Sequence, residues 1–133
     1  MSKKKNQSQP TASELAILQI LWNKGPLSVR DIHDILSQVK DVVYTTILKT
    51  MQIMTERGFL VRESAGRKHI YSAVIAQEDT QNKLLDKFLE RTFGGSAKRM
   101  VMRALGNYNT SPEDLEDLKN LISELEENKT EEE

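Results

Sequence analysis

Cysteine is absent from the 133-residue sequence, which excludes a disulfide framework and a thiolate metal site. Long apolar runs are absent as well, since no stretch comes near the roughly 20 apolar residues that a membrane-spanning helix needs. The basic N-terminus, MSKKKNQSQP, is not followed by the apolar segment of a secretory signal. We therefore expect a cytoplasmic protein without a membrane partner.

The sequence also lacks the short motifs that carry catalytic chemistry. It contains no Gly-rich phosphate loop, no HExxH motif and no recognisable Ser/His/Asp set. The many acidic residues near the C-terminus fall on a face that we expect to be solvated, so they give no support to a metal site. We expect neither enzymatic activity nor a bound metal or cofactor.

Charge is distributed unevenly along the chain, although the net charge is only −1. Residues 1–78 contain 11 lysines and arginines against 7 acidic residues, whereas residues 79–133 contain 8 against 13. A basic front half and an acidic rear half are typical of a nucleic-acid-binding module joined to a region of another kind. The three terminal glutamates exaggerate the contrast, but the front half is positive without them.

Capping signals predict the first two helices. Thr11 and Glu14 have the spacing of a capping box, and Ser28 is followed by Asp31 three residues later. A turn at residues 23–26 separates the two helices. Free N–H groups at a helix N-terminus bind anions, so Ser28 marks a candidate phosphate contact.

The stretch from residue 41 to residue 60 predicts a third helix with two different faces. The apolar face contains Ile47, Met51 and Met54. The opposite face is polar and mostly non-acidic, with Thr45, Lys49, Gln52 and Glu56. Two helices joined by a short link, the second with a polar outer face, form a helix-turn-helix that reads the major groove. An ordinary solvated surface has the same pattern.

Two stretches rich in β-branched and aromatic residues follow, at 59–63 and 69–74, and they predict a β-hairpin. The loop between them carries Arg67 and Lys68, which could reach phosphates or the minor groove. A solubilising turn is the alternative for these two cations. The order helix, helix, helix, hairpin predicts a winged helix-turn-helix at residues 11–78, preceded by a disordered basic arm at residues 1–10.

Three further amphipathic helices are predicted in a second domain at residues 79–127, before an acidic disordered tail at residues 128–133. Helices this short cannot bury all their apolar faces on one another, and a second copy of the chain is the simplest cover. Folding back onto the winged domain is the alternative. The candidate dimerisation residues are Leu84, Leu85, Phe88, Leu89, Met100, Val101, Leu105, Leu115, Leu118, Ile122 and Leu125.

Several short motifs, in this order and at this spacing, resemble the penicillinase repressor family (BlaI/MecI/CopY) of bacterial winged-helix repressors. The resemblance covers about residues 11–125. Its motifs are Ser13-Glu14-Leu15 with Ile17-Leu18 and Leu21-Trp22, Tyr44-Thr45-Thr46-Ile47, Arg57-Gly58-Phe59-Leu60, Gly66-Arg67 with Tyr71, Phe93-Gly94-Gly95-Ser96, and Ser111-Pro112-Glu113 with Leu115.

The resemblance implies a homodimer whose N-terminal winged helix binds DNA and whose C-terminal helices dimerise. It also implies an operator that is an inverted repeat upstream of the regulated genes. Carried over by position, the third helix would present to DNA Tyr44, Thr45, Thr46, Lys49 and Gln52, and the wing would add Arg67 and Lys68.

The chain departs from the family pattern at two places. Antibiotic-responsive members are inactivated by cleavage at an Asn–Phe pair in the fifth helix, where this sequence reads Met102-Arg103-Ala104. Copper-responsive members end in paired cysteines, which this chain lacks. The inducing signal, any upstream protease or sensor, and the target genes are therefore not defined by the sequence.

Together these patterns predict a mainly α protein (α+β) with a small hairpin wing. Its predicted function is that of a sequence-specific transcriptional repressor that binds double-stranded DNA as a homodimer. Two alternatives stay open at this point. One is a winged-helix protein-interaction module without DNA affinity, and the other is a winged-helix regulator that responds to a small molecule.

Overall fold

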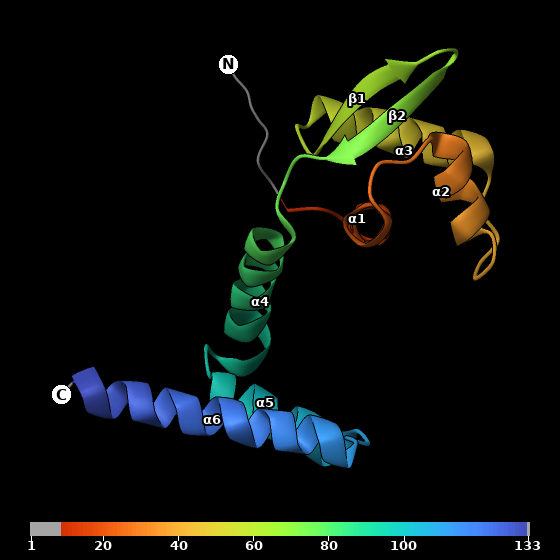
Figure 1. The fold of residues 1–133 in the computed structure, drawn as a ribbon. Helices are drawn as coiled ribbons and strands as arrows, with labels where there is room; N and C mark the ends of the chain where they lie inside the picture. The colour runs from red at the N-terminus through yellow and green to blue at the C-terminus, as the bar shows by residue number, and fades with distance from the viewer. Residues whose placement is uncertain (1–8, 133) are drawn as a thin grey trace. The chain divides into compact units, whose positions relative to one another are not determined.

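The computed structural model describes residues 9–132, so most of the predicted basic arm lies outside the described residues (Figure 1). Within this range the chain forms six helices and one two-stranded antiparallel hairpin, which confirms the predicted mainly α fold. Contacts divide the chain into two compact units, with the boundary between residues 87 and 88. The elements in order are α1 Ala12–Lys24, α2 Val29–Leu36, α3 Tyr44–Glu56, β1 Leu60–Ala65, β2 Lys68–Ala73, α4 Gln77–Phe93, α5 Ala97–Asn107 and α6 Pro112–Glu132.

Both predicted capping boxes are present. The Glu14 amide donates to Thr11 Oγ1 at 3.2 Å, and the Thr11 amide donates to Glu14 Oε1 at 2.9 Å. At the start of α2 the Asp31 amide donates to Ser28 Oγ at 3.1 Å, and the Ser28 amide donates to Asp31 Oδ2 at 3.2 Å. Each box satisfies two N–H groups that a helix end otherwise leaves without acceptors, which fixes where α1 and α2 begin.

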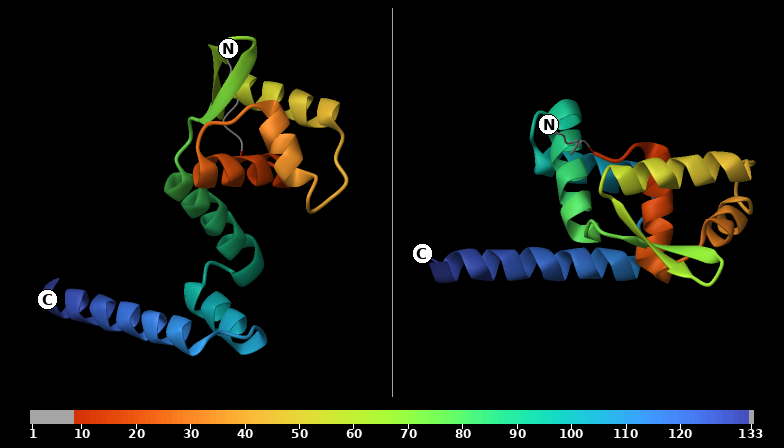
Figure 2. Two further views of the ribbon diagram at one scale, coloured as in Figure 1. Left: turned by 45° about the vertical axis from the view of Figure 1, so that its right-hand side comes forward. Right: turned by 90° about the horizontal axis from the view of Figure 1, so that it is seen from above.

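One apolar core holds the first unit together. Figure 2 shows α1, α2 and α3 gathered around one another, with the hairpin running beside α3. The buried face of α3 is the predicted one, and it packs with residues of the other elements in a cluster that includes Leu18, Ile32, Ile47, Met51, Met54, Leu60 and Tyr71. Since a two-stranded hairpin is marginal alone in water, burial on this core is what stabilises the wing.

The hairpin is attached to the helices through Tyr71 of β2. Its side chain is 1% exposed, and its main chain forms a β-bridge with Leu27, the residue just before the α2 cap. The Tyr71 amide donates to the Leu27 carbonyl at 2.8 Å, and the Leu27 amide donates back at 3.1 Å. The wing is therefore held at a fixed place beside the start of α2.

The turn of the hairpin is shorter than the sequence predicted. We expected a loop over residues 64–68, but Ala65 pairs with Lys68, so the loop is only Gly66 and Arg67. Gly66 has φ of +68°, a conformation that glycine adopts without steric cost and that a tight two-residue turn requires. Lys68 consequently belongs to β2 rather than to the loop.

An ion pair joins the start of α1 to the end of α3. Arg57 Nη1 lies 2.7 Å from both carboxylate oxygens of Glu14, whose side chain is 6% exposed. The Arg57 guanidinium also lies over the ring of Phe59, 4.5 Å from its centroid. Two residues that are 43 positions apart in the sequence thus fix the direction in which α3 crosses the core.

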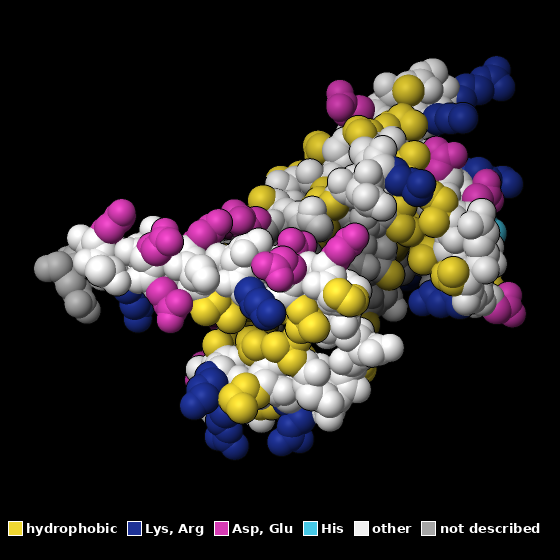
Figure 3. All heavy atoms as spheres, turned by 60° about the horizontal axis from the view of Figure 1, so that its bottom comes forward, with side chains coloured by type: hydrophobic (Ala, Val, Ile, Leu, Met, Phe, Trp, Pro, Cys, Tyr) yellow, Lys and Arg dark blue, Asp and Glu magenta, His cyan; other side chains and the backbone are white. Residues whose placement is uncertain are grey.

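The second unit contains the end of α4 and all of α5 and α6, and none of its described residues is buried. Apolar side chains stand exposed on it, among them Met102 at 63% and Ile122 at 56%. Figure 3 shows such side chains in yellow beside the magenta carboxylates of α6.

Helix α6 does not end where the sequence predicted. It continues to Glu132, through most of the segment that we expected to be a disordered tail from residue 128 onward. The reason is compositional, because glutamate and lysine are good helix formers and the segment contains no glycine or proline to stop the helix.

Candidate nucleic-acid interface

The polar face of α3 lies exposed, as the sequence predicted. Thr45, Lys49 and Gln52 are all exposed, and they follow one another along the side of the helix opposite its buried face. Glu56 is exposed at the far end of the same face. The row therefore offers one cation and neutral hydrogen-bonding groups over most of its length, and a carboxylate only in its last turn.

The beginning of α3 has no side-chain cap. Val43 occupies the N-cap position, no side chain within residues 9–132 accepts a hydrogen bond from the first turn, and that turn contains no acidic residue. The N–H groups of Thr46 and Ile47 donate to the Val43 carbonyl. Those of Tyr44 and Thr45 have no acceptor within residues 9–132, so this end of α3 presents the positive end of its dipole.

The wing places its two cations next to the start of α2. Arg67 forms the turn, Lys68 begins β2, and both side chains are exposed. The positive charge of Lys68 acts on Asp31 at the beginning of α2. Hydrogen bonds from the backbone and side chain of Ser28 and, to a lesser degree, the charge of Lys68 hold the pKa of Asp31 below its ordinary value of 3.8.

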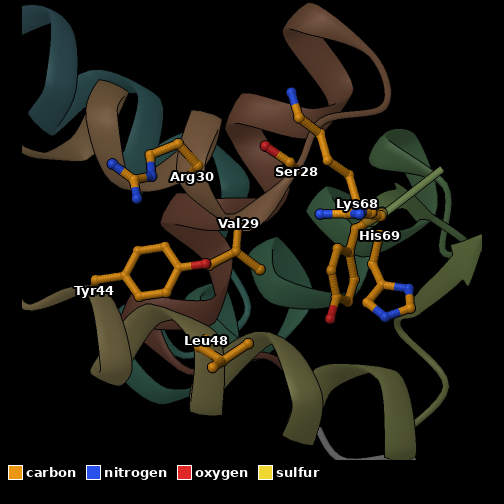
Figure 4. A pocket seen from close by; sticks show the side chains of 9 residues that line it. Ser28, Val29, Arg30, Tyr44, Leu48, Lys68 and His69 are labelled. Carbon is orange, nitrogen blue, oxygen red and sulfur yellow. The ribbon is translucent and has the colours of Figure 1, made fainter. Parts of the chain in front are cut away.

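A cavity of about 240 Å³ opens between the start of α2, the start of α3 and the wing. We call it the notch (Figure 4). Its apolar floor includes Val29, Leu48 and Tyr71. Cations from two directions stand on its rim: Arg30 from α2, and Arg67 and Lys68 from the wing.

Arg30 is the residue of this surface that the sequence analysis missed. Its guanidinium carbon lies 5.4 Å from the centroid of the Tyr44 ring, and the same ring meets His33 edge-on at a centroid distance of 5.8 Å. A cation in the first turn of a helix opposes the helix dipole, which makes it unfavourable there on stability grounds alone. That mismatch is the signal by which Arg30 could have been found from the sequence.

The other predicted contact residues differ in how far they are exposed to solvent. Ser28 is 6% exposed and its amide already donates to Asp31, so its main place is as the cap of α2. The amides of Val29 and Arg30 are the ones at this helix end that have no acceptor in the described chain. Tyr44 is 37% exposed beside the notch, and Thr46 is exposed at the edge of the α3 face.

The residues predicted for dimerisation lie on α4, α5 and α6, and each of them is exposed or half-buried in the single chain. Leu84, Leu89, Met100 and Leu118 are the half-buried ones. The prediction omitted three further apolar side chains that stand exposed on α5, α6 and the turn between them: Met102, Tyr108 and Leu121.

Within residues 9–132, no helix combines the length and the hydropathy that crossing a bilayer requires. No three histidine, cysteine, aspartate or glutamate side chains within residues 9–132 are grouped closely enough to hold a metal ion.

The chain has a winged helix with a basic wing and an exposed third helix that is largely non-acidic. These features are typical of the winged-helix class of DNA-binding regulators. The family model described as penicillinase repressor matches residues 10–124. The chain therefore belongs to the penicillinase repressor family. It is a DNA-binding transcriptional repressor and not an enzyme.

The individual relatives are distant. A penicillinase repressor of Staphylococcus aureus is 22% identical, over 90% of this chain and 94% of its own length. A penicillinase repressor of Bacillus licheniformis is 24% identical, over 87% and 91%. Among solved structures, the solution structure of apo-NmtR covers 77% of this chain and 72% of its own, with a TM-score of 0.42 and 25% identity.

Proposed function

We propose that the protein represses transcription as a homodimer that binds an inverted-repeat operator in the cytoplasm. Each copy places the exposed face of α3 in a major groove and its wing against the neighbouring backbone. The observation that carries this proposal is the exposed row of Thr45, Lys49 and Gln52 on α3, a helix whose Tyr44 and Leu48 line the notch with the wing cations Arg67 and Lys68.

The side chains on α3 suit the reading of base edges. The major groove admits an α-helix, and each base pair presents there its own pattern of donors and acceptors. Lysine pairs with the acceptors of guanine and glutamine with the donor and acceptor of adenine, so Lys49 and Gln52 supply sequence preference. Thr45 and the amides at the uncapped end of α3 supply contacts to the flanking phosphates.

The second unit supports the dimerisation part of the proposal. This unit exposes apolar residues such as Leu121, Ile122 and Leu125, and none of its described residues is buried. It therefore has no core of its own. A two-fold dimer is the commonest way to cover such faces. Two winged units joined in this way would read half-sites separated by about one helical turn of DNA, roughly 34 Å, or a multiple of it.

The test separates reading of bases from general affinity for DNA. Duplexes selected from a random pool define a preferred site, and binding to that site and to a scrambled duplex is then measured by gel shift. The double variant Lys49→Ala, Gln52→Ala should lose most of its preference for the selected site while sedimenting as the wild type does. Equal loss of affinity on both duplexes would contradict base reading by α3.

The net charge of −1 had left open a winged-helix module without DNA affinity, and membership of the penicillinase repressor family speaks against that alternative. Retention on a DNA resin at low salt, with elution by added salt, is the expected result. A chain that passes through the resin would contradict the DNA-binding role.

A further inference from the structure

We propose that the notch binds one phosphate of the DNA backbone together with the adjoining deoxyribose, and that Arg30 is the principal phosphate contact. This inference rests on the proposed DNA-binding function and names a contact that the sequence patterns did not identify. The proposal rests on one observation: the cavity has an apolar floor, and cations from two different elements, α2 and the wing, stand on its rim.

Within residues 9–132, no partner occupies the guanidinium hydrogen bonds of Arg30. In the described residues no carboxylate forms an ion pair with it, and its side chain is exposed. Its contact is the face of Tyr44, at 5.4 Å. Stacking on an aromatic ring holds a guanidinium in place while leaving its N–H groups directed at solvent, so less conformational freedom is lost when an anion binds.

The wing supplies charge from the opposite side of the same cavity. Arg67 and Lys68 line the notch with Arg30, so an anion there lies between cations of two elements. No acidic side chain is among the described residues that line the notch, and Asp31, the carboxylate on which Lys68 acts, is engaged by the amide of Ser28 at 3.2 Å. The notch therefore favours an anion, and the planar fork of arginine suits the tetrahedral oxygens of a phosphate.

The size and floor of the notch point to a nucleotide backbone rather than to an isolated ion. Its volume of about 240 Å³ is many times the roughly 10–15 Å³ of cavity space that a single water needs. The apolar floor that Val29 and Leu48 provide suits the carbons of a sugar. Because Tyr44 is the first residue of α3, a phosphate held here would set the depth at which α3 enters the groove.

Binding of the full-length Arg30→Ala variant to the selected and scrambled duplexes tests the assignment across a range of salt concentrations. We expect affinity to fall about ten-fold on both duplexes, because a phosphate contact carries no sequence information. The slope of log affinity against log salt should become shallower by about 0.9. Arg30→Lys, which keeps the charge but loses the planar fork, should retain the wild-type slope with intermediate affinity.

Lys24→Ala is the matched control, since Lys24 is an exposed cation of α1 that does not line the notch. Duplexes carrying one neutral methylphosphonate linkage at a time then locate the phosphate. One linkage in each half-site should weaken the wild type and leave Arg30→Ala unaffected.

The outcomes separate the two proposals. Wild-type affinity and slope in Arg30→Ala, with thermal melting confirming that it is folded, would overturn the notch assignment. The loss of site preference in the Lys49 and Gln52 variant would then still support the repressor. Failure of the wild-type chain to bind either duplex would overturn the proposed function itself.

Discussion

The two units of this chain differ in whether they complete their own core. The first buries residues from α1, α2, α3 and the hairpin around a common centre, with Leu18, Ile32 and Met51 at 0% exposure. The second has no buried residue among those described, although it is rich in leucine and contains Ile122 and Leu125, both more than half exposed. The first unit is therefore stabilised by its own packing, and the second needs an apolar surface from elsewhere.

Removing a core side chain from the first unit should have the largest effect on stability. Leu18→Ala should lower the free energy of unfolding by about 3–5 kcal/mol, because it deletes a fully buried side chain and leaves a cavity. Chemical denaturation followed by circular dichroism measures the change. An effect that varies with protein concentration would mean that this core, too, depends on a partner.

Breaking the ion pair between α1 and α3 should cost slightly less. Glu14→Gln should destabilise the first unit by about 3 kcal/mol, the lower end of the range for buried pairs, because the Arg57 side chain retains 19% exposure. Glu63→Gln is the matched control, an exposed glutamate with no ion pair in the described chain. Equal losses in the two variants would show that the pair contributes nothing specific.

Charges introduced on the apolar face of α6 should dissociate the proposed homodimer without unfolding the winged unit. We expect Ile122→Glu with Leu125→Glu to raise the dimer dissociation constant at least 100-fold, because the carboxylates would be buried without partners. Sedimentation velocity across a concentration series measures this. Asn120→Glu, which adds a charge at an exposed polar position of α6, should leave the dimer intact.

The wing should contribute through charge alone. Arg67→Ala should reduce the slope of log affinity against log salt by about 0.9, with affinity falling several-fold and site preference unchanged. Binding assays at four or five salt concentrations give the slope directly. An unchanged slope would remove Arg67 from the phosphate contacts.

The cap of α2 should give the smallest effect, and one that depends on pH. The pKa of Asp31 is lowered in the folded state, so its stabilisation is present above the ordinary value of 3.8 and is lost as pH falls through the folded-state pKa. Asp31→Asn should therefore be less stable than the wild type near neutral pH. The difference should disappear in acid, and a difference that persists below the folded-state pKa would assign the effect to something other than ionisation.

Local patterns in the sequence predicted most of the first unit. Thr11 with Glu14, and Ser28 with Asp31, marked two helix starts because capping depends on residues only three positions apart. The periodicity of Ile47, Met51 and Met54 identified the buried face of α3 for the same reason.

Features that depend on distant contacts escaped the sequence analysis. The Glu14–Arg57 pair spans 43 positions, and the place of Arg30 over Tyr44 exists only once α2 and α3 have packed together. The burial of Ser28 likewise follows from the wing lying beside α2. The length of α6 was misjudged for a different reason, because its charged end was treated as a tail despite its favourable helix composition.

The central claim is that the second unit joins two copies of the chain and that the first binds DNA. Sedimentation equilibrium of the full-length protein at micromolar concentration tests the first half of it most directly. The account predicts a mass of about 30 kDa, twice the 15.2 kDa of one chain, and two chains on each duplex that carries an inverted repeat. A single species of 15.2 kDa that binds as one copy per duplex would contradict it.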